Sequence, residues 1–218
     1  EFLETIEFDG VAPKEVVVAK RYQATPNAVF VLQWNGTDDF TELTRAGAQS
    51  GPSSITVLDF DGDGFMDLYM MNGTWLPGIS DEEGKVFACS PNKLFRNRGD
   101  GTFEEIGEQA GVDDRHWSMA AGAIDYDHDG DQDLYLLNYG PNIFYENNGD
   151  GTFSDITGRL GLRGPDSLNG FVKWSVGVSF WDYNRDGLLD AFVGNFLAFD
   201  PEYVSPTTPE MMPHPSEY

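Results

Sequence analysis

The sequence predicts an all-β protein built from repeats, and three observations lead to that prediction. A short acidic loop recurs along the chain of 218 residues. An apolar run of strand length follows each acidic loop. A Gly-rich turn of the hairpin type, Asn-Gly-Asp-Gly or Arg-Gly-Asp-Gly, then follows the first two of these runs. Four short strands in each unit are typical of a propeller blade, and we expect about three and a half to four blades.

The clearest acidic loop begins at Asp125, with further Asp residues at loop positions 3, 5 and 9 and Gly130 at position 6. Carboxylates this close repel each other by roughly 1 kcal/mol per pair at ~4 Å, even in water. A hard cation removes that repulsion, and Ca²⁺ takes about 6–8 oxygens, which alternate positions of a tight loop can supply. Gly130 allows the sharp turn. Loops that begin at Asp59 and Asp182 repeat the pattern, so we predict three Ca²⁺ sites.

Other interpretations of the loops are weaker. An EF-hand needs a bidentate Glu at position 12 and flanking helices. Position 12 holds Met70, Leu136 and Val193, and the flanking segments have the pattern of strands. Mg²⁺ is less favoured because it requires stricter octahedral geometry. Solvated turns without a metal remain the alternative, although three loops in register argue against chance.

A fourth, degenerate copy of the loop begins at Glu7. Its third ligand position is Val11 and its glycine is replaced by Ala12. We therefore expect a loop there without a metal. Strand-like runs follow at residues 16–19 and 28–34, and the second of them ends in the turn signal Asn35-Gly36.

The remaining elements follow the same order in each unit. Residues 92–103 and 142–153 each predict a strand, a Gly-rich hairpin and a strand that begins with Phe. No long segment has a 3.6-residue apolar period with caps, so we expect no helix. The whole chain, 1–218, is expected to form a single propeller segment. Its repeat units are about 7–50, 51–111, 117–161 and 174–218, the last of them incomplete.

Composition and charge limit the classes of function. Asp and Glu number 37 against 13 Lys and Arg, which gives a formal net charge of −24. This charge argues against binding nucleic acid or anionic membrane surfaces. No apolar run approaches the ~20 residues that cross a bilayer. The sequence begins at Glu1 rather than Met, so we expect a processed or truncated chain.

These loops, together with the Trp-Ser stretches before them and the Asn-Gly-Asp-Gly-Thr-Phe stretch after them, resemble the FG-GAP/VCBS repeat. The resemblance is to the ASPIC/UnbV-type and integrin-α-like β-propeller proteins, and it covers residues from about 7 to 200. It implies a partial integrin-α-like propeller whose loops bind Ca²⁺ through side chains and one backbone carbonyl each. The implied ligands are Asp59, Asp61, Asp63, Asp67 and the carbonyl of Phe65; Asp125, Asp127, Asp129, Asp133 and the carbonyl of Asp131; and Asp182, Asn184, Asp186, Asp190 and the carbonyl of Leu188. Asn184 lowers the charge of the third site, which we expect to be the weakest.

The leading functional hypothesis is a non-catalytic, calcium-binding extracytoplasmic scaffold, whether secreted, periplasmic or on the cell surface. Its partner would be another protein chain, which could complete the propeller ring, or a glycan. Binding would fall to the inserted segments 73–91 and 197–218, because loops on a rigid scaffold carry function. No catalytic residue and no organic cofactor site is predicted. The alternative hypothesis is a propeller domain of a polysaccharide-degrading or other hydrolytic enzyme.

Overall fold

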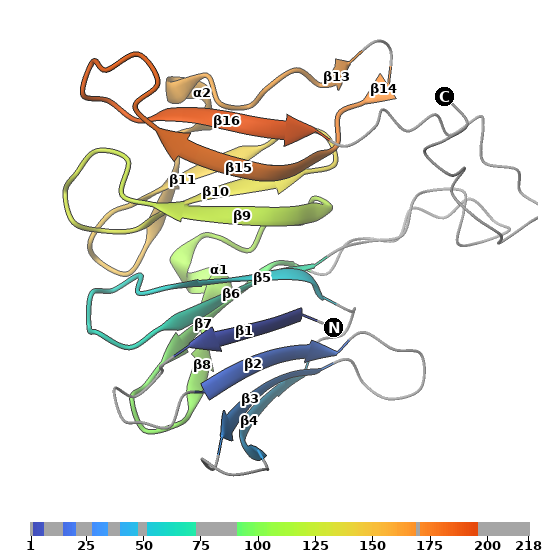
Figure 1. Cartoon of the computed structure of the whole chain (residues 1–218), viewed down its shortest axis with the longest axis vertical. Coiled ribbons are helices and arrows are strands. Elements are labelled where there is room, and N and C mark those ends of the chain that lie inside the picture. The colour runs from blue at the N-terminus through green and yellow to red at the C-terminus, as the bar shows by residue number, and fades with distance from the viewer. Residues whose placement is uncertain are drawn as a thin grey trace, which may run out of the picture.

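The computed structural model describes residues 2–6, 15–20, 28–34, 40–47, 52–72, 91–168 and 171–195, with side chains in 53–72, 91–166 and 172–195. These residues form a row of antiparallel sheets in which strands pair in chain order (Figure 1). The sheets comprise β1 (Phe2–Ile6), β2 (Glu15–Lys20), β3 (Ala28–Trp34) and β4 (Phe40–Gly47); β5 (Pro52–Leu58), β6 (Asp67–Asn72), β7 (Lys93–Asn97) and β8 (Phe103–Glu105); β9 (Ser118–Ile124), β10 (Asp133–Asn138), β11 (Ile143–Asn147) and β12 (Phe153–Asp155); and β15 (Ser175–Trp181) with β16 (Asp190–Asn195). A two-stranded ribbon, β13 (Ser167–Leu168) and β14 (Phe171–Val172), lies between the third and fourth sheets in the sequence.

The second strands of the middle sheets explain the continuous apolar runs of the sequence. Every residue of β6 and of β10 is buried, on both faces. A strand between two neighbouring sheets has no solvent face, so it needs no polar alternation. The acidic loops connect the first and second strands of the second, third and fourth sheets, and in Figure 1 all three lie at the same side of the row.

The second and third sheets share the largest apolar cluster. Leu58 and Tyr69 from the second sheet meet Leu134 and Leu136 from the third, and all four are at most 1% exposed. Burying side chains of this size contributes about 1.5–3 kcal/mol each. The contact is also polar: the Thr56 hydroxyl donates a hydrogen bond of 3.0 Å to the carbonyl of Ala121 on β9.

The third and fourth sheets pack through a second cluster. Tyr135 and Phe144 of the third sheet meet Val178 and Phe180 of β15. Gly122 on β9 permits this approach, because a Cβ added there would lie 2.7 Å from Val178 Cγ1 and 2.9 Å from Phe180 Cε2.

The expectation of no helix is wrong at two places. α1 (Gly107–Ala110) follows β8 and α2 (Thr157–Leu160) follows β12, each four residues long. Both end at a glycine in the left-handed region, Gly111 with φ 79° and Gly161 with φ 69°. One helical turn is too short to show a 3.6-residue period, so sequence periodicity could not reveal it.

The all-β class and the partial propeller are confirmed by this architecture. The boundaries of the repeat units and the number of blades stay predictions. The degenerate loop at 7–14, residues 73–90 of the inserted segment 73–91, and the whole of the inserted segment 197–218 lie outside the described residues. Within the described part of the chain, no helix is long and apolar enough to cross a membrane.

Candidate metal centres in the acidic loops

Each acidic loop is folded by hydrogen bonds from its backbone to its own carboxylates. In the second loop, the amides of Asp129 and Gly130 donate to the two oxygens of Asp125, each at 3.1 Å. The amide of Asp131 donates to Asp129 Oδ1 at 2.9 Å. Equivalent bonds join Gly64 N to Asp59 Oδ2, Phe65 N to Asp63 Oδ1, Gly187 N to Asp182 Oδ2 and Leu188 N to Asp186 Oδ1. The Asp at position 1 therefore orders the turn around itself.

Two positions of each loop adopt left-handed backbone. At position 6 the glycines fit the expectation, with φ of 88° for Gly64, 101° for Gly130 and 88° for Gly187. Position 4 is also left-handed, where His128 has φ 64° and Arg185 has φ 63°. Residues other than glycine rarely adopt this conformation. The left-handed backbone at position 4 could therefore not be predicted from His128 and Arg185.

The Asp at position 9 anchors the loop to the sheet. Asp67 is 0% exposed and accepts hydrogen bonds from the amides of Asn97 at 2.7 Å and Phe60 at 3.0 Å. Burial raises its pKa from 3.8 to about 7, although the two amides oppose that shift. Asp133 makes the equivalent bonds to Asn147 and Tyr126, and burial raises its pKa to about 6.

The structure brings the carboxylates at positions 1, 3 and 9 together in two loops. One group is Asp59, Asp61 and Asp67, and the other is Asp125, Asp127 and Asp133. In each group one oxygen per residue lies within 4.8 Å of the others. Carboxylates are the hard oxygen ligands that Ca²⁺ prefers.

The first group also contains oxygens without a hydrogen bond. Asp59 Oδ1 and Asp61 Oδ1 are buried and accept none within the described part of the chain. A buried carboxylate oxygen without a donor is costly, and a cation removes that cost. The residues of the first loop therefore fit a divalent cation.

The other predicted ligands are placed differently. Asp63 and Asp129, at position 5, use one oxygen for the loop backbone and are outside the two groups of convergent acids. In the third loop, the Asn184 amide oxygen accepts from Asp186 N at 2.9 Å, and its amide nitrogen donates to Asp186 Oδ2 at 2.9 Å. Among the described residues no group of three acids converges in that loop. The Ca²⁺ role of all these residues, including the carbonyls of position 7, stays a prediction.

Sequence reasoning missed the residues that join one loop to the next sheet. The amide of Asp59 donates to Gln132 Oε1 at 3.0 Å, and Asn147 Nδ2 donates to the carbonyl of Phe60 at 2.7 Å. Gln132 belongs to the second acidic loop and Asn147 to the hairpin after it. The repeated Asn at the end of β7 and of β11 was the available signal. The first loop is thus fixed by the neighbouring sheet as well as by its own.

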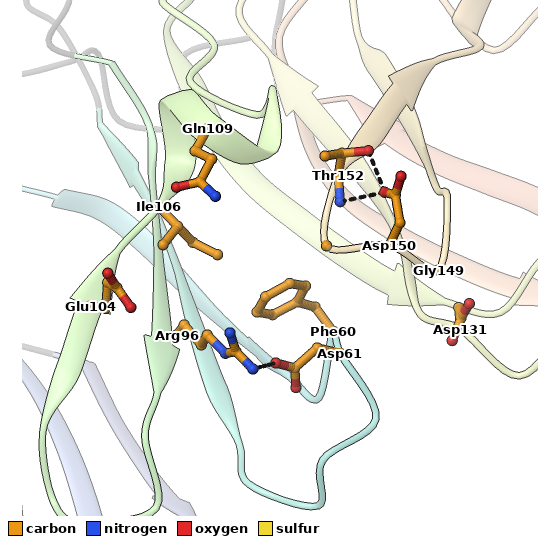
Figure 2. Close-up of a pocket in the computed structure, with 11 residues that line it drawn as sticks. Phe60, Asp61, Arg96, Glu104, Ile106, Gln109, Asp131, Gly149, Asp150 and Thr152 are labelled. Atoms are coloured by element: carbon orange, nitrogen blue, oxygen red, sulfur yellow. Dashed lines mark hydrogen bonds and ion pairs between the residues drawn. The ribbon is translucent and has the colours of Figure 1, made fainter.

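An arginine also contacts the first group of carboxylates. Arg96 Nη2 on β7 lies 2.7 Å from Asp61 Oδ2. Figure 2 shows the two side chains pointing toward each other. Burial raises the pKa of Asp61, whereas the Arg96 guanidinium opposes that rise. Among the described residues, no ion pair to Asp125, Asp127 or Asp133 is found in the second loop.

A cavity of about 420 Å³ lies beside Arg96, between the second and third sheets (Figure 2). Phe60 and Ile106 supply its apolar wall. Its acidic residues are Asp61, Glu104, Asp131 and Asp150. Asp61 pairs with Arg96, Glu104 pairs with Arg98 at 2.9 Å, and Asp150 accepts a hydrogen bond of 2.6 Å from the Thr152 hydroxyl.

The fold and the loops together define a class: an all-β repeat protein with acidic loops at one side of a row of antiparallel sheets. The chain belongs to the FG-GAP-like repeat family, whose pattern matches residues 14–70, 85–136 and 125–193. The resemblance inferred from the loops is thereby confirmed at the level of the family. The ASPIC/UnbV subtype stays a prediction.

One curated relative is the human (Homo sapiens) protein named cartilage acidic protein 1. The two are 42% identical over 67 residues, which cover 29% of this chain and 10% of the human protein. The match therefore concerns a short part of a much longer chain. This chain matches only about a tenth of the length of the human protein.

Proposed function

We propose that the chain is a non-catalytic, calcium-stabilised part of an extracellular repeat scaffold. The observation that supports this most directly is the first group of acids, where Asp59 and Asp61 each have a buried oxygen that accepts no hydrogen bond from the residues that the structure describes. Asp59, Asp61 and Asp67 would hold the ion, and the equivalent acids of the second loop would hold another. The ion would supply positive charge that lets these carboxylates stay ionised while buried.

Calcium at the loops would stabilise more than the loops. The first loop is hydrogen-bonded to Gln132 and Asn147 of the next sheet, so ordering that loop also holds two sheets together. Extracellular calcium modules have Kd values of about 10⁻⁴–10⁻³ M. At millimolar Ca²⁺, each site would then add roughly 0.5–1.5 kcal/mol by mass action. An extracellular location agrees with this requirement, with the repeat family and with a relative named for cartilage.

The cavity between the second and third sheets favours a scaffold over a hydrolase. A glycoside hydrolase needs a carboxylic acid and a second carboxylate that are free to exchange protons or attack the substrate. Three of the four acids in this cavity are already held by Arg96, Arg98 or Thr152. We therefore retain the non-catalytic hypothesis.

The first test is thermal unfolding of the chelator-treated protein, with and without 1 mM CaCl₂. We expect Ca²⁺ to raise the Tm by several degrees, because about 1 kcal/mol corresponds to roughly 2–4 °C in a protein of this size. MgCl₂ at the same concentration should give a smaller rise. An unchanged Tm with Ca²⁺ would overturn the calcium proposal.

Two variants locate the effect. Asp127→Asn removes one carboxylate of the second group, in an exposed position, and should reduce the Ca²⁺-induced rise in Tm. Asp113→Asn removes an equal charge outside the loops and should leave that rise unchanged. An equal loss in both variants would show that Ca²⁺ acts through overall charge alone.

We further propose that the outer face of the fourth sheet binds another repeat of the same kind. Positions that neighbouring sheets cover elsewhere are open here. Leu58, Phe60 and Tyr69 in the second sheet are at most 2% exposed. At the equivalent positions of the fourth sheet, Trp181 is 42%, Tyr183 77% and Phe192 63% exposed.

The chemistry of this face matches a strand from a further repeat. Trp181 and Phe192 pack against each other in a tilted arrangement, with ring centroids 6.0 Å apart and an interplanar angle of 40°. Ser179 occupies the position of Thr56, whose hydroxyl donates to the first strand of the next sheet. An exposed apolar face of this kind is typical of an interaction site.

A second copy of the chain supplies such a repeat, so self-association tests this part of the proposal. Native mass spectrometry at rising concentration should show a dimer, and the double variant Trp181→Ser, Phe192→Ser should shift it toward monomer. Val172→Ser, at an exposed valine on β14 outside this sheet, is the control. A folded monomer at all concentrations would contradict the assignment of this face.

A further inference from the structure

The first and second acidic loops have different cationic surroundings. Arg96 lies on β7, and its guanidinium contacts Asp61 of the first loop, with Nη2 2.7 Å from Oδ2. The Arg96 side chain is 47% exposed and the Asp61 side chain 14% exposed. A positive charge therefore already sits on the carboxylate group from the solvent side.

The equivalent position in the third sheet carries the opposite charge. Glu146 on β11 occupies the place of Arg96, and it pairs with Arg159 Nη2 at 2.6 Å. Its other contact is the Tyr126 hydroxyl, which donates to Glu146 Oε1 at 2.6 Å. The cation of that junction is therefore held by Glu146 and Tyr126 rather than by a loop carboxylate.

We propose that Arg96 sets the calcium affinity of the first loop by acting as a resident cation on Asp61. This inference rests on the proposed calcium function and adds a residue outside the loops to it. Without Ca²⁺, the guanidinium compensates part of the negative charge of Asp59, Asp61 and Asp67. When Ca²⁺ binds, Arg96 opposes it, because a second positive charge remains beside the same carboxylate.

Two consequences follow for the protein. The first loop would fill at a higher Ca²⁺ concentration than the second, although both have the same three convergent acids. Arg96 and Asp61 also line the cavity between the second and third sheets. Of the two loops with three convergent acids, the one that fills at the higher Ca²⁺ concentration is thus the one whose backbone is bonded to the neighbouring sheet, through Gln132 and Asn147.

The test is isothermal titration of CaCl₂ into the chelator-treated whole chain. In Arg96→Gln, we expect the weaker of the two sites with three convergent acids to bind Ca²⁺ roughly three- to tenfold more tightly, the range that loss of one nearby charge gives in a water-like dielectric. The variant should also show a larger Ca²⁺-induced rise in Tm. Arg96→Lys keeps the charge and should bind Ca²⁺ as the unmodified chain does.

Arg98→Gln is the matched control, because Arg98 is also on the surface, 53% exposed, and pairs with Glu104 rather than with a ligand. It should leave the Ca²⁺ affinity nearly unchanged. Equal affinities in the Arg96→Gln and Arg98→Gln variants would overturn the role of Arg96, as would weaker binding in Arg96→Gln. If the unmodified chain binds no Ca²⁺, the proposed function itself fails, which is a separate outcome.

Discussion

The two junctions whose side chains are described on both sides have equivalent backbones but different side chains. In the third sheet, Tyr126 belongs to the cluster shared with Phe180 of the fourth sheet, and it forms a closed network with Glu146 and Arg159, with Arg159 Nη2 2.5 Å from the Tyr126 hydroxyl. Between the second and third sheets, the equivalent positions hold Phe60, Arg96 and Gln109. All three of these line the cavity of about 420 Å³ (Figure 2).

The comparison shows that the repeat fixes the backbone and leaves the junctions to individual side chains. Phe60 lacks the hydroxyl that Tyr126 uses, and Arg96 replaces a glutamate. With no carboxylate on β7 to meet, the guanidinium of Arg96 pairs with Asp61 in the acidic loop. The third sheet therefore holds its cation in a network with Tyr126 and Glu146, whereas the second sheet couples its cation to the acidic loop beside a cavity.

The largest effect on stability should come from replacing Gly122, the residue on β9 that lets the third sheet pack closely against β15. Gly122 and Thr56 occupy equivalent positions on β9 and β5. Gly122→Thr introduces the residue of the second sheet into the contact between the third and fourth sheets. Even an added Cβ would lie under 3 Å from Val178 and Phe180, so the threonine side chain cannot fit without a shift. We expect a loss of about 1–3 kcal/mol in the free energy of unfolding, measured by urea titration.

Gly177→Ala is the control for this substitution, because an added Cβ there has nothing within 4 Å. It should change stability by less than about 0.5 kcal/mol. If Gly122→Thr is as stable as Gly177→Ala, the third and fourth sheets do not pack as closely in solution as the structure has them.

A smaller loss of stability should come from Tyr126→Phe, which places in the third repeat unit the residue that the second unit has at this position, Phe60. The variant removes the hydroxyl that joins Glu146 to Arg159. Because both partners are near the surface, we expect a loss of only about 0.5–1 kcal/mol in thermal or urea unfolding.

Tyr183→Phe makes the same change at the equivalent position of the fourth sheet, where the side chain is 77% exposed. It should leave the stability unchanged. A similar loss in both variants would mean that the closed network contributes nothing of its own.

The last effect is of about the same size but depends on pH, and it concerns a buried lysine between β14 and β15. Lys173 is 2% exposed, and its ammonium group donates to the carbonyl of Arg163 at 3.2 Å. Burial lowers its pKa from 10.5 to about 8, with Arg163 adding to the shift and Asp166 opposing it. The unfolded chain therefore binds more protons between pH 8 and 10.5, so this residue makes stability rise with pH in that range.

Lys173→Met removes the buried charge and should raise the free energy of unfolding at pH 7 by about 1 kcal/mol. That advantage should shrink as the pH rises above 8 and the native lysine loses its proton. Urea titrations of both proteins at pH 7 and pH 10 measure the difference. An advantage that is equal at both pH values would show that burial does not lower the pKa of Lys173 in the folded protein.

The acidic loops and the strands after them could be predicted from sequence because both are local. The turn depends on glycines at fixed positions and on carboxylates that accept bonds from amides two to five residues ahead, as Asp125 does. Six consecutive buried residues in β10 likewise appear as one apolar run. The helices α1 and α2 were missed because a single turn carries no period.

The sequence by itself determined the repeat, the all-β class and the loop that begins at Asp59, since these follow from short-range spacing. Only the tertiary structure decided which acids converge, because Asp67 and Asp133 reach their loops by standing at the start of a buried strand. It alone decided that Arg96, from another strand, lies on Asp61. It also decided that Trp181 and Phe192 stay exposed while their equivalents are covered. Contacts between distant segments depend on how sheets pack, and no local pattern encodes them.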